Sequence, residues 1–84
     1  MSYDYMKQRA YVFSESGIKM FLTIRDRAKE LLEEAGAFRE QELHNCVSGY
    51  SWDMLACVDY LVERGEIRRI YAEGPRQYNI YTEN

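Results

Sequence analysis

The sequence predicts a small α+β domain in which three helices precede a C-terminal β-hairpin. Apolar residues recur at helical spacing through the first two thirds of the chain. Two short runs rich in β-branched and aromatic residues then follow, separated by a Gly-Pro turn. With 84 residues the chain can build one hydrophobic core, so we expect a single domain over 1–84. Hydrophobic residues make up 46% of the chain, which excludes a disordered protein.

The first helix is predicted from apolar residues spaced three or four positions apart. Ser14 or Ser16 can cap its start, and Gly36 can end it in a left-handed conformation. The apolar positions are Ile18, Phe21, Leu22, Ile24, Ala28, Leu31, Leu32 and Ala35.

Two shorter helices are predicted next. One covers residues 40–48 and is closed by Gly49. The other covers 51–64, with Ser51 as its N-terminal cap and Gly65 after its end. Its apolar residues form one face and are Met54, Leu55, Val58, Leu61 and Val62.

The hairpin is predicted from strands over 67–72 and 77–82, joined by a turn over 73–76. We expect Tyr78 and Ile80 to face the helices. Residues 1–13 form an aromatic N-terminal extension, which we expect either to cover the domain or to pair with a second chain. Whether it is helical or extended stays open.

This order of elements resembles the winged helix-turn-helix superfamily. The segment over 58–69, Val-Asp-Tyr-Leu-Val-Glu-Arg-Gly-Glu-Ile-Arg-Arg, is similar to the one that closes the recognition helix and enters the wing in multiple-antibiotic-resistance-type regulators. Residues 42–51 are similar to the preceding helix and turn, and small pilus phase-variation regulators share the size and layout. The resemblance implies a winged helix and a DNA-binding transcriptional regulator, acting as a dimer, with helix 51–64 in the major groove of duplex DNA and wing 67–82 on the backbone.

By position, the resemblance implies a set of DNA-binding residues. Ser51 would contact a phosphate or a base edge, and Trp52 a sugar or a thymine methyl group. The alternative for Trp52 is packing on the N-terminal aromatics or the wing. Arg68 and Arg69 are adjacent on a strand, so we expect only one of them to face DNA and the other to pair with a carboxylate. The full set is Arg39, Ser51, Trp52, Ala56, Tyr60, Arg69 and Arg76.

The charge distribution opposes this interpretation. The formal net charge is −3; residues 1–36 are neutral overall, 37–66 carry −4 and 67–84 carry +1. Affinity for DNA depends on cationic contacts with phosphates, so the wing arginines would have to supply most of the attraction. The alternative hypothesis is a winged-helix interaction module whose acidic third helix and aromatic residues bind a protein partner or a second copy of the chain.

Other functions find no support in the sequence. His44, Cys46 and Cys57 lack the number and spacing of zinc ligands, and we expect no metal and no cofactor. Glu40 and Glu42 are interpreted as solvated carboxylates, and no catalytic constellation points to an enzyme. The longest apolar run, 54–58, is far too short for a membrane span. The N-terminus does not resemble a signal peptide, so a cytoplasmic protein with reduced cysteines is expected.

Overall fold

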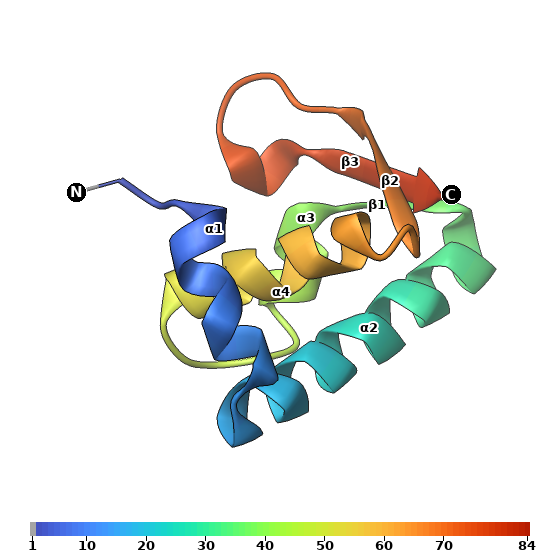
Figure 1. Ribbon diagram of the computed structural model, residues 1–84. Coiled ribbons are helices and arrows are strands. Elements are labelled where there is room, and N and C mark those ends of the chain that lie inside the picture. Colours follow the sequence, from blue (N-terminus) through green and yellow to red (C-terminus); the bar gives the residue numbers. More distant parts are fainter. Residues whose placement is uncertain (1) are drawn as a thin grey trace.

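The computed structural model describes residues 2–84 and confirms the α+β class (Figure 1). Over these residues it has four α-helices, two 3-10 helices and three strands. In chain order they are α1 (Tyr5–Gln8), the 3-10 helix η1 (Arg9–Phe13), α2 (Glu15–Ala35), β1 (Ala37–Arg39), α3 (Glu40–His44), α4 (Ser51–Glu63), β2 (Ile67–Tyr71), the 3-10 helix η2 (Arg76–Tyr78) and β3 (Ile80–Glu83).

Helix α2 begins and ends where the sequence predicted. The Ser14 hydroxyl accepts a hydrogen bond from the Gly17 N–H at 3.0 Å, which confirms Ser14 as the cap. Gly36 adopts the left-handed conformation with φ 77° and donates its N–H to the Leu32 carbonyl. One stripe of the helix faces the core, and its buried hydrophobic residues are Phe21, Ile24, Ala28 and Leu31.

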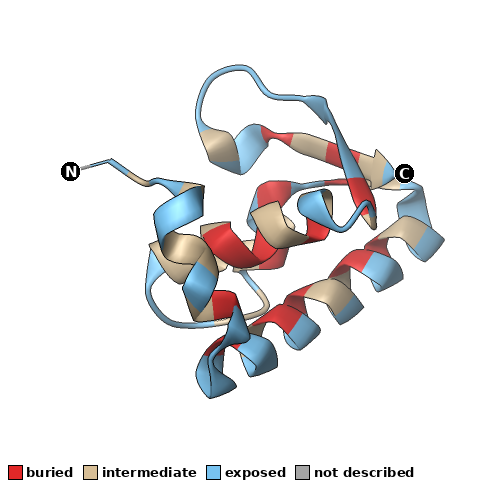
Figure 2. Cartoon of the chain, in the orientation of Figure 1, coloured by how far each residue is buried: buried red, intermediate tan, exposed pale blue. Residues whose placement is uncertain are grey.

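Helices α3 and α4 are shorter than predicted, and α4 starts differently. The predicted helix over 40–48 ends at His44. Helix α4 covers Ser51–Glu63, but its cap position is Tyr50, which makes no side-chain capping bond; the prediction that Ser51 is the cap was wrong. The buried residues of α4 lie at the centre of the core (Figure 2) and are Ala56, Cys57, Val58 and Leu61.

The hairpin is confirmed, but it belongs to a three-stranded antiparallel sheet of order β1-β3-β2. Strand β1 was not predicted, because three residues are too few to show an alternating pattern. The second hairpin strand begins at Ile80 instead of residue 77, because the N–H groups of Tyr78 and Asn79 bond to the carbonyls of Pro75 and Arg76.

The face of β3 that packs on the helices also differs from the prediction. Tyr81 is fully buried, whereas Tyr78 is exposed and Ile80 only half-buried. Because successive residues of a strand point to opposite faces, Tyr81 faces inward and Ile80 outward. The expectation that Tyr78 and Ile80 face the helices was therefore wrong.

The N-terminal extension covers the domain, as one of the two alternatives predicted. Helix α1 packs on α4, and η1 packs on both α2 and α4 (Figure 1). Val12 of η1 is buried in the core. Backbone contact at Gly17 fixes this arrangement: a Cβ atom at Gly17 would lie 1.8 Å from the Tyr11 carbonyl oxygen and 2.9 Å from Val12 Cα. Met1 lies outside the described residues.

The close approach at Gly17 predicts an unusual result for alanine substitution. In an open helical position, glycine to alanine would stabilise the protein by about 1 kcal/mol. Here Gly17→Ala should instead lower the free energy of unfolding by roughly 1–3 kcal/mol, because the new methyl group overlaps the η1 backbone. Urea unfolding measures the change, with exposed Ser16→Ala as the matched control. A stabilised Gly17→Ala protein would show that η1 does not pack on α2.

Candidate functional site

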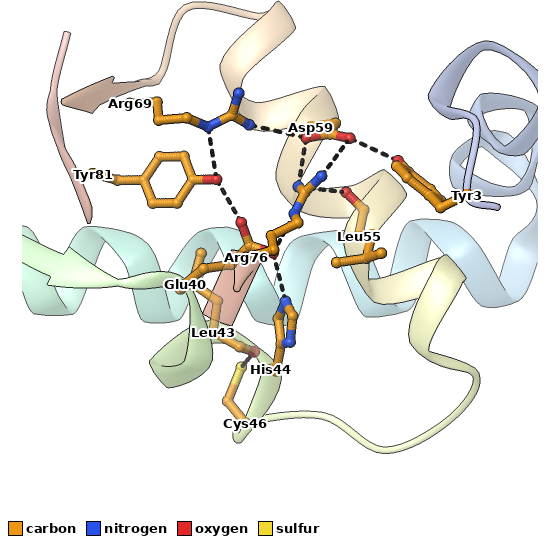
Figure 3. Close-up of polar contacts among 10 residues, drawn as sticks. All are labelled: Tyr3, Glu40, Leu43, His44, Cys46, Leu55, Asp59, Arg69, Arg76 and Tyr81. Atoms are coloured by element: carbon orange, nitrogen blue, oxygen red, sulfur yellow. Dashed lines mark hydrogen bonds and ion pairs between the residues drawn. The ribbon is translucent and has the colours of Figure 1, made fainter. Parts of the chain in front are cut away.

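A buried carboxylate lies where α3, the sheet and the loop between β2 and β3 meet. Glu40 is the first residue of α3 and its side chain is fully buried. Its carboxylate accepts hydrogen bonds from Tyr81 Oη at 2.5 Å, Arg76 Nε at 2.6 Å and His44 Nε2 at 2.9 Å (Figure 3). The prediction that Glu40 is a solvated carboxylate was wrong.

Arg76 joins this carboxylate to a second one on α4. Its Nη2 lies 2.5 Å from Asp59 Oδ1, so one guanidinium binds both Glu40 and Asp59 (Figure 3). Asp59 also accepts hydrogen bonds from Tyr3 Oη at 2.7 Å and Arg69 Nη2 at 3.2 Å. We refer to Glu40, Asp59, Arg76 and Tyr81 as the buried ion network; Arg69, which is exposed, binds it from β2.

The network determines the charge state of its members. Burial alone would raise the pKa of Glu40, but the hydrogen bonds from His44, Arg76 and Tyr81 lower it below its ordinary value. Burial alone would lower the pKa of Arg76, but Asp59 and Glu40 raise it. Burial and the charge of Glu40 raise the pKa of Tyr81 to about 12. At neutral pH the Glu40 carboxylate is therefore ionised, Arg76 is protonated and the Tyr81 phenol is neutral.

The N-terminal segment covers the remaining carboxylates of α4. Gln8 Nε2 donates to Asp53 Oδ1 at 2.7 Å. Glu63 binds Arg9 Nε at 2.9 Å and accepts a hydrogen bond from Tyr5 Oη at 3.1 Å. All three carboxylates of α4, including Asp59, are thus bound within the chain. Helix α4 lies between α2 and the loop that follows β2 (Figure 1).

The structure separates the three arginines of the predicted DNA-binding set. Arg69 and Arg76 are paired with Asp59 and point toward α4. Arg39 is exposed at the end of β1, and no carboxylate pairs with its side chain among residues 2–84. The expectation that one of Arg68 and Arg69 pairs with a carboxylate is confirmed for Arg69.

The predicted residues of α4 do not form one accessible surface. Ala56 is fully buried, so it does not lie on the exposed face where it was expected. Tyr60 is half-buried and packs with its ring centroid about 5 Å from those of Phe13 and Phe21. Trp52 is half-buried and makes an edge contact with Tyr3, as the packing alternative predicted. Only Ser51, at the start of the helix, is exposed.

The outer face of the sheet, which points away from α4, carries two of the exposed aromatic residues, Tyr71 and Tyr78. Arg39 lies beside Ile80 on β3, and Ile80 lies beside Tyr71 on β2. These three residues line an open concavity of about 560 Å³ together with Tyr78, Glu73 and the turn at Gly74 and Pro75. We call this surface the outer sheet face. Its shape was not predicted, because it depends on the unpredicted strand β1.

The cysteines and His44 do not form a metal site. Cys46 and Cys57 are free thiols, and burial raises the pKa of Cys57 to about 12. His44 binds Glu40. Within residues 2–84 there is no cluster of three side chains suited to hold a metal ion.

Comparison of the chain with protein-family models, curated proteins and solved structures found no match. Among the described residues, no helix has the length and apolar character needed to cross a membrane.

The shared guanidinium predicts a large effect of removing Arg76. Arg76→Ala leaves the buried Glu40 carboxylate without its cation, and breaking such a buried pair costs roughly 3–5 kcal/mol of unfolding free energy. Exposed Arg39→Ala is the matched control and should change stability by less than about 0.5 kcal/mol. Chemical denaturation of both variants at neutral pH measures the difference. Equal stability of the two variants would contradict a structural role for Arg76.

The lowered pKa of Glu40 predicts acid sensitivity. Because the folded-state pKa lies below the unfolded value of about 4.5, the stabilisation is complete above that pH and is lost as the pH falls through the folded pKa. Glu40→Gln should be less stable than the wild type at neutral pH but lose less stability in acid. Thermal unfolding between pH 7 and pH 3 measures this, with exposed Glu34→Gln as the control that should follow the wild type.

Proposed function

We propose that the chain is a winged-helix protein that acts through protein contacts made by its outer sheet face. The order of helix, strand, two helices and hairpin, with the sheet order β1-β3-β2, supports the winged-helix assignment. Segment 58–69, which carried the resemblance, spans the end of α4 and the start of β2. In this assignment α4 takes the place of the recognition helix and the hairpin over 67–82 is the wing.

The observation that carries the proposal is the enclosure of α4. Its carboxylates bind the wing through Arg76 and the N-terminal segment through Tyr3, Tyr5, Gln8 and Arg9. A helix covered in this way has no side to place in a major groove, which would have to accommodate the whole helix.

Removing the N-terminal segment would not create a DNA-binding helix. It would free the carboxylates of Asp53, Asp59 and Glu63 from their partners in that segment, and carboxylates repel phosphates. Two of the three wing arginines would still be neutralised by Asp59 and Glu40. Arg69 and Arg76 are therefore bound within the domain and do not supply the attraction that DNA binding needs.

The outer sheet face has the composition of a protein-binding surface. Tyr71 and Tyr78, which line it, are 45% and 44% exposed, and the neighbouring Ile70 is 49% exposed. Exposed apolar groups gathered in one region indicate an interaction site, and tyrosine and arginine are enriched at protein interfaces. Arg39 and Arg68 supply the charged rim.

A DNA titration followed by amide NMR signals tests the proposal. Because α4 is covered, duplex DNA at low salt should leave the signals of residues 51–63 unmoved. Salt-dependent shifts in α4 would contradict the proposal. Double-stranded fragments of mixed sequence and genomic fragments are both used, so that a missing cognate site does not mimic the expected result.

DNA binding by a transcriptional regulator is the second candidate function. The exposed Arg39 and Arg68 favour it, since no carboxylate pairs with either one within the described part of the chain. In this candidate, shifts would appear at these two arginines and would weaken steeply with salt. Arg39→Ala with Arg68→Ala would abolish them, whereas Lys29→Ala on α2 would leave them unchanged.

A further inference from the structure

Two tyrosines of the outer sheet face have free rings and free hydroxyl groups. Tyr71 and Tyr78 line its concavity and are exposed. Among residues 2–84, neither ring belongs to an aromatic pair and neither lies under an arginine. The tyrosine hydroxyls that donate hydrogen bonds within these residues are those of Tyr3, Tyr5 and Tyr81. Tyr71 and Tyr78 therefore offer apolar rings and hydroxyl donors to another molecule.

The concavity offers no free backbone groups at its centre. Ile80 lies on the central strand β3, which pairs with β1 on one side and with β2 on the other. The backbone N–H and C=O groups of such a strand are used by its two neighbours. Side chains must therefore recognise whatever lies over Ile80, since an added strand needs a free sheet edge.

Two opposite charges border the same concavity without binding each other. Arg39 borders it from β1, and Glu73 borders it from the loop that follows β2. None of the ion pairs among residues 2–84 involves either side chain, whereas Asp59 binds both Arg69 and Arg76. The surface thus complements a ligand that carries an acidic and a basic group on either side of an apolar centre.

We propose that this concavity binds a proline-rich segment of a partner protein, flanked by an acidic residue that meets Arg39 and a basic residue that meets Glu73. The proposal rests on the proposed function of the outer sheet face in protein contacts and names the class of partner. Proline-rich segments form the polyproline II helix, which has no internal hydrogen bonds and docks in aromatic-lined grooves. Because proline has no N–H group, its backbone provides only carbonyl acceptors, and these match the hydroxyl donors of Tyr71 and Tyr78.

The dimensions of the concavity agree with such a segment. Neighbouring strands lie about 4.8 Å apart, so the backbones at Arg39 and Tyr71, which flank Ile80, are separated by about 10 Å. One three-residue turn of polyproline II covers about 9 Å. An acidic residue beside Arg39 therefore places the residue three positions along beside Tyr71. The concavity is open, which suits a chain that passes across it better than a small molecule, because small ligands are enclosed over most of their surface.

Binding of defined peptides to the full chain tests the proposal. The probe is a peptide of five prolines between a glutamate and a lysine, blocked at both ends, and amide NMR signals report binding. It should shift the signals of Tyr71, Gly74, Tyr78 and Ile80. A control peptide with glycines in place of the prolines should bind more than about tenfold more weakly, because it is not held in the extended form.

Charge reversal in the protein identifies the two ionic contacts. Arg39→Glu should weaken binding of the glutamate–lysine peptide about fivefold or more, and should bind a peptide with lysine at both ends better than the wild type does. Glu73→Lys should instead prefer a peptide with glutamate at both ends. The matched controls Lys29→Glu and Glu34→Lys change exposed residues of α2 and should bind all peptides as the wild type does. Circular dichroism should show all four variants folded, because the substituted side chains are exposed.

Three results would overturn the proposal. One is the absence of shifts with the glutamate–lysine peptide at millimolar concentration. Another is equal affinity for the proline and glycine peptides. The third is a set of shifts that follows the free edge of β2 and omits Tyr78, because that pattern indicates an added strand.

These outcomes are distinct from those that test the proposed function. A chain that binds none of the peptides removes the proline-rich class of partner and leaves α4 enclosed. Movement of the α4 signals on adding DNA would overturn the protein-contact function whether or not the peptides bind.

Discussion

The carboxylate of Glu40 is the interaction on which the other arrangements depend. Taking a charge out of water costs several kcal/mol unless donors surround it. Its donors come from three places in the chain: His44 on α3, Arg76 in η2 and Tyr81 on β3. Glu40 therefore fixes α3, the loop between β2 and β3, and the central strand β3 relative to one another (Figure 3).

The same network explains why α4 is enclosed. Once Glu40 holds the Nε side of Arg76, the remaining nitrogens of the guanidinium reach Asp59 on α4. Asp59 in turn receives Tyr3 from the N-terminal segment. A single chain of ionic hydrogen bonds thus draws both the loop between β2 and β3 and the N-terminal segment onto the helix. The contacts that stabilise the domain are the same ones that cover α4, which is why the outer sheet face is the stronger candidate for function.

The sequence predicted the elements that have a long apolar period or marked residues at their ends. Helix α2 has a long apolar stripe between Ser14 and Gly36, and the hairpin has a marked turn at Gly74 and Pro75. The sequence pattern did not predict β1, because three residues are too few to show an alternation. It also did not predict η2, where local backbone hydrogen bonds replace the expected strand. Glu40 looked like any solvated carboxylate, because its burial depends on partners 36 and 41 residues away in the chain.

The buried ion network also shapes the edge of the sheet. In a regular strand Arg69 and Tyr71 would share a face, because side chains alternate. Arg69 is held inward by Tyr81 and Asp59, and the irregularity at Ile70 returns Tyr71 to the opposite face beside Ile80. Without that extra residue, Tyr71 would point toward α4 and would not line the outer sheet face. The polar contacts of Arg69 and the irregularity at Ile70 together decide which side chains of β2 lie on that face.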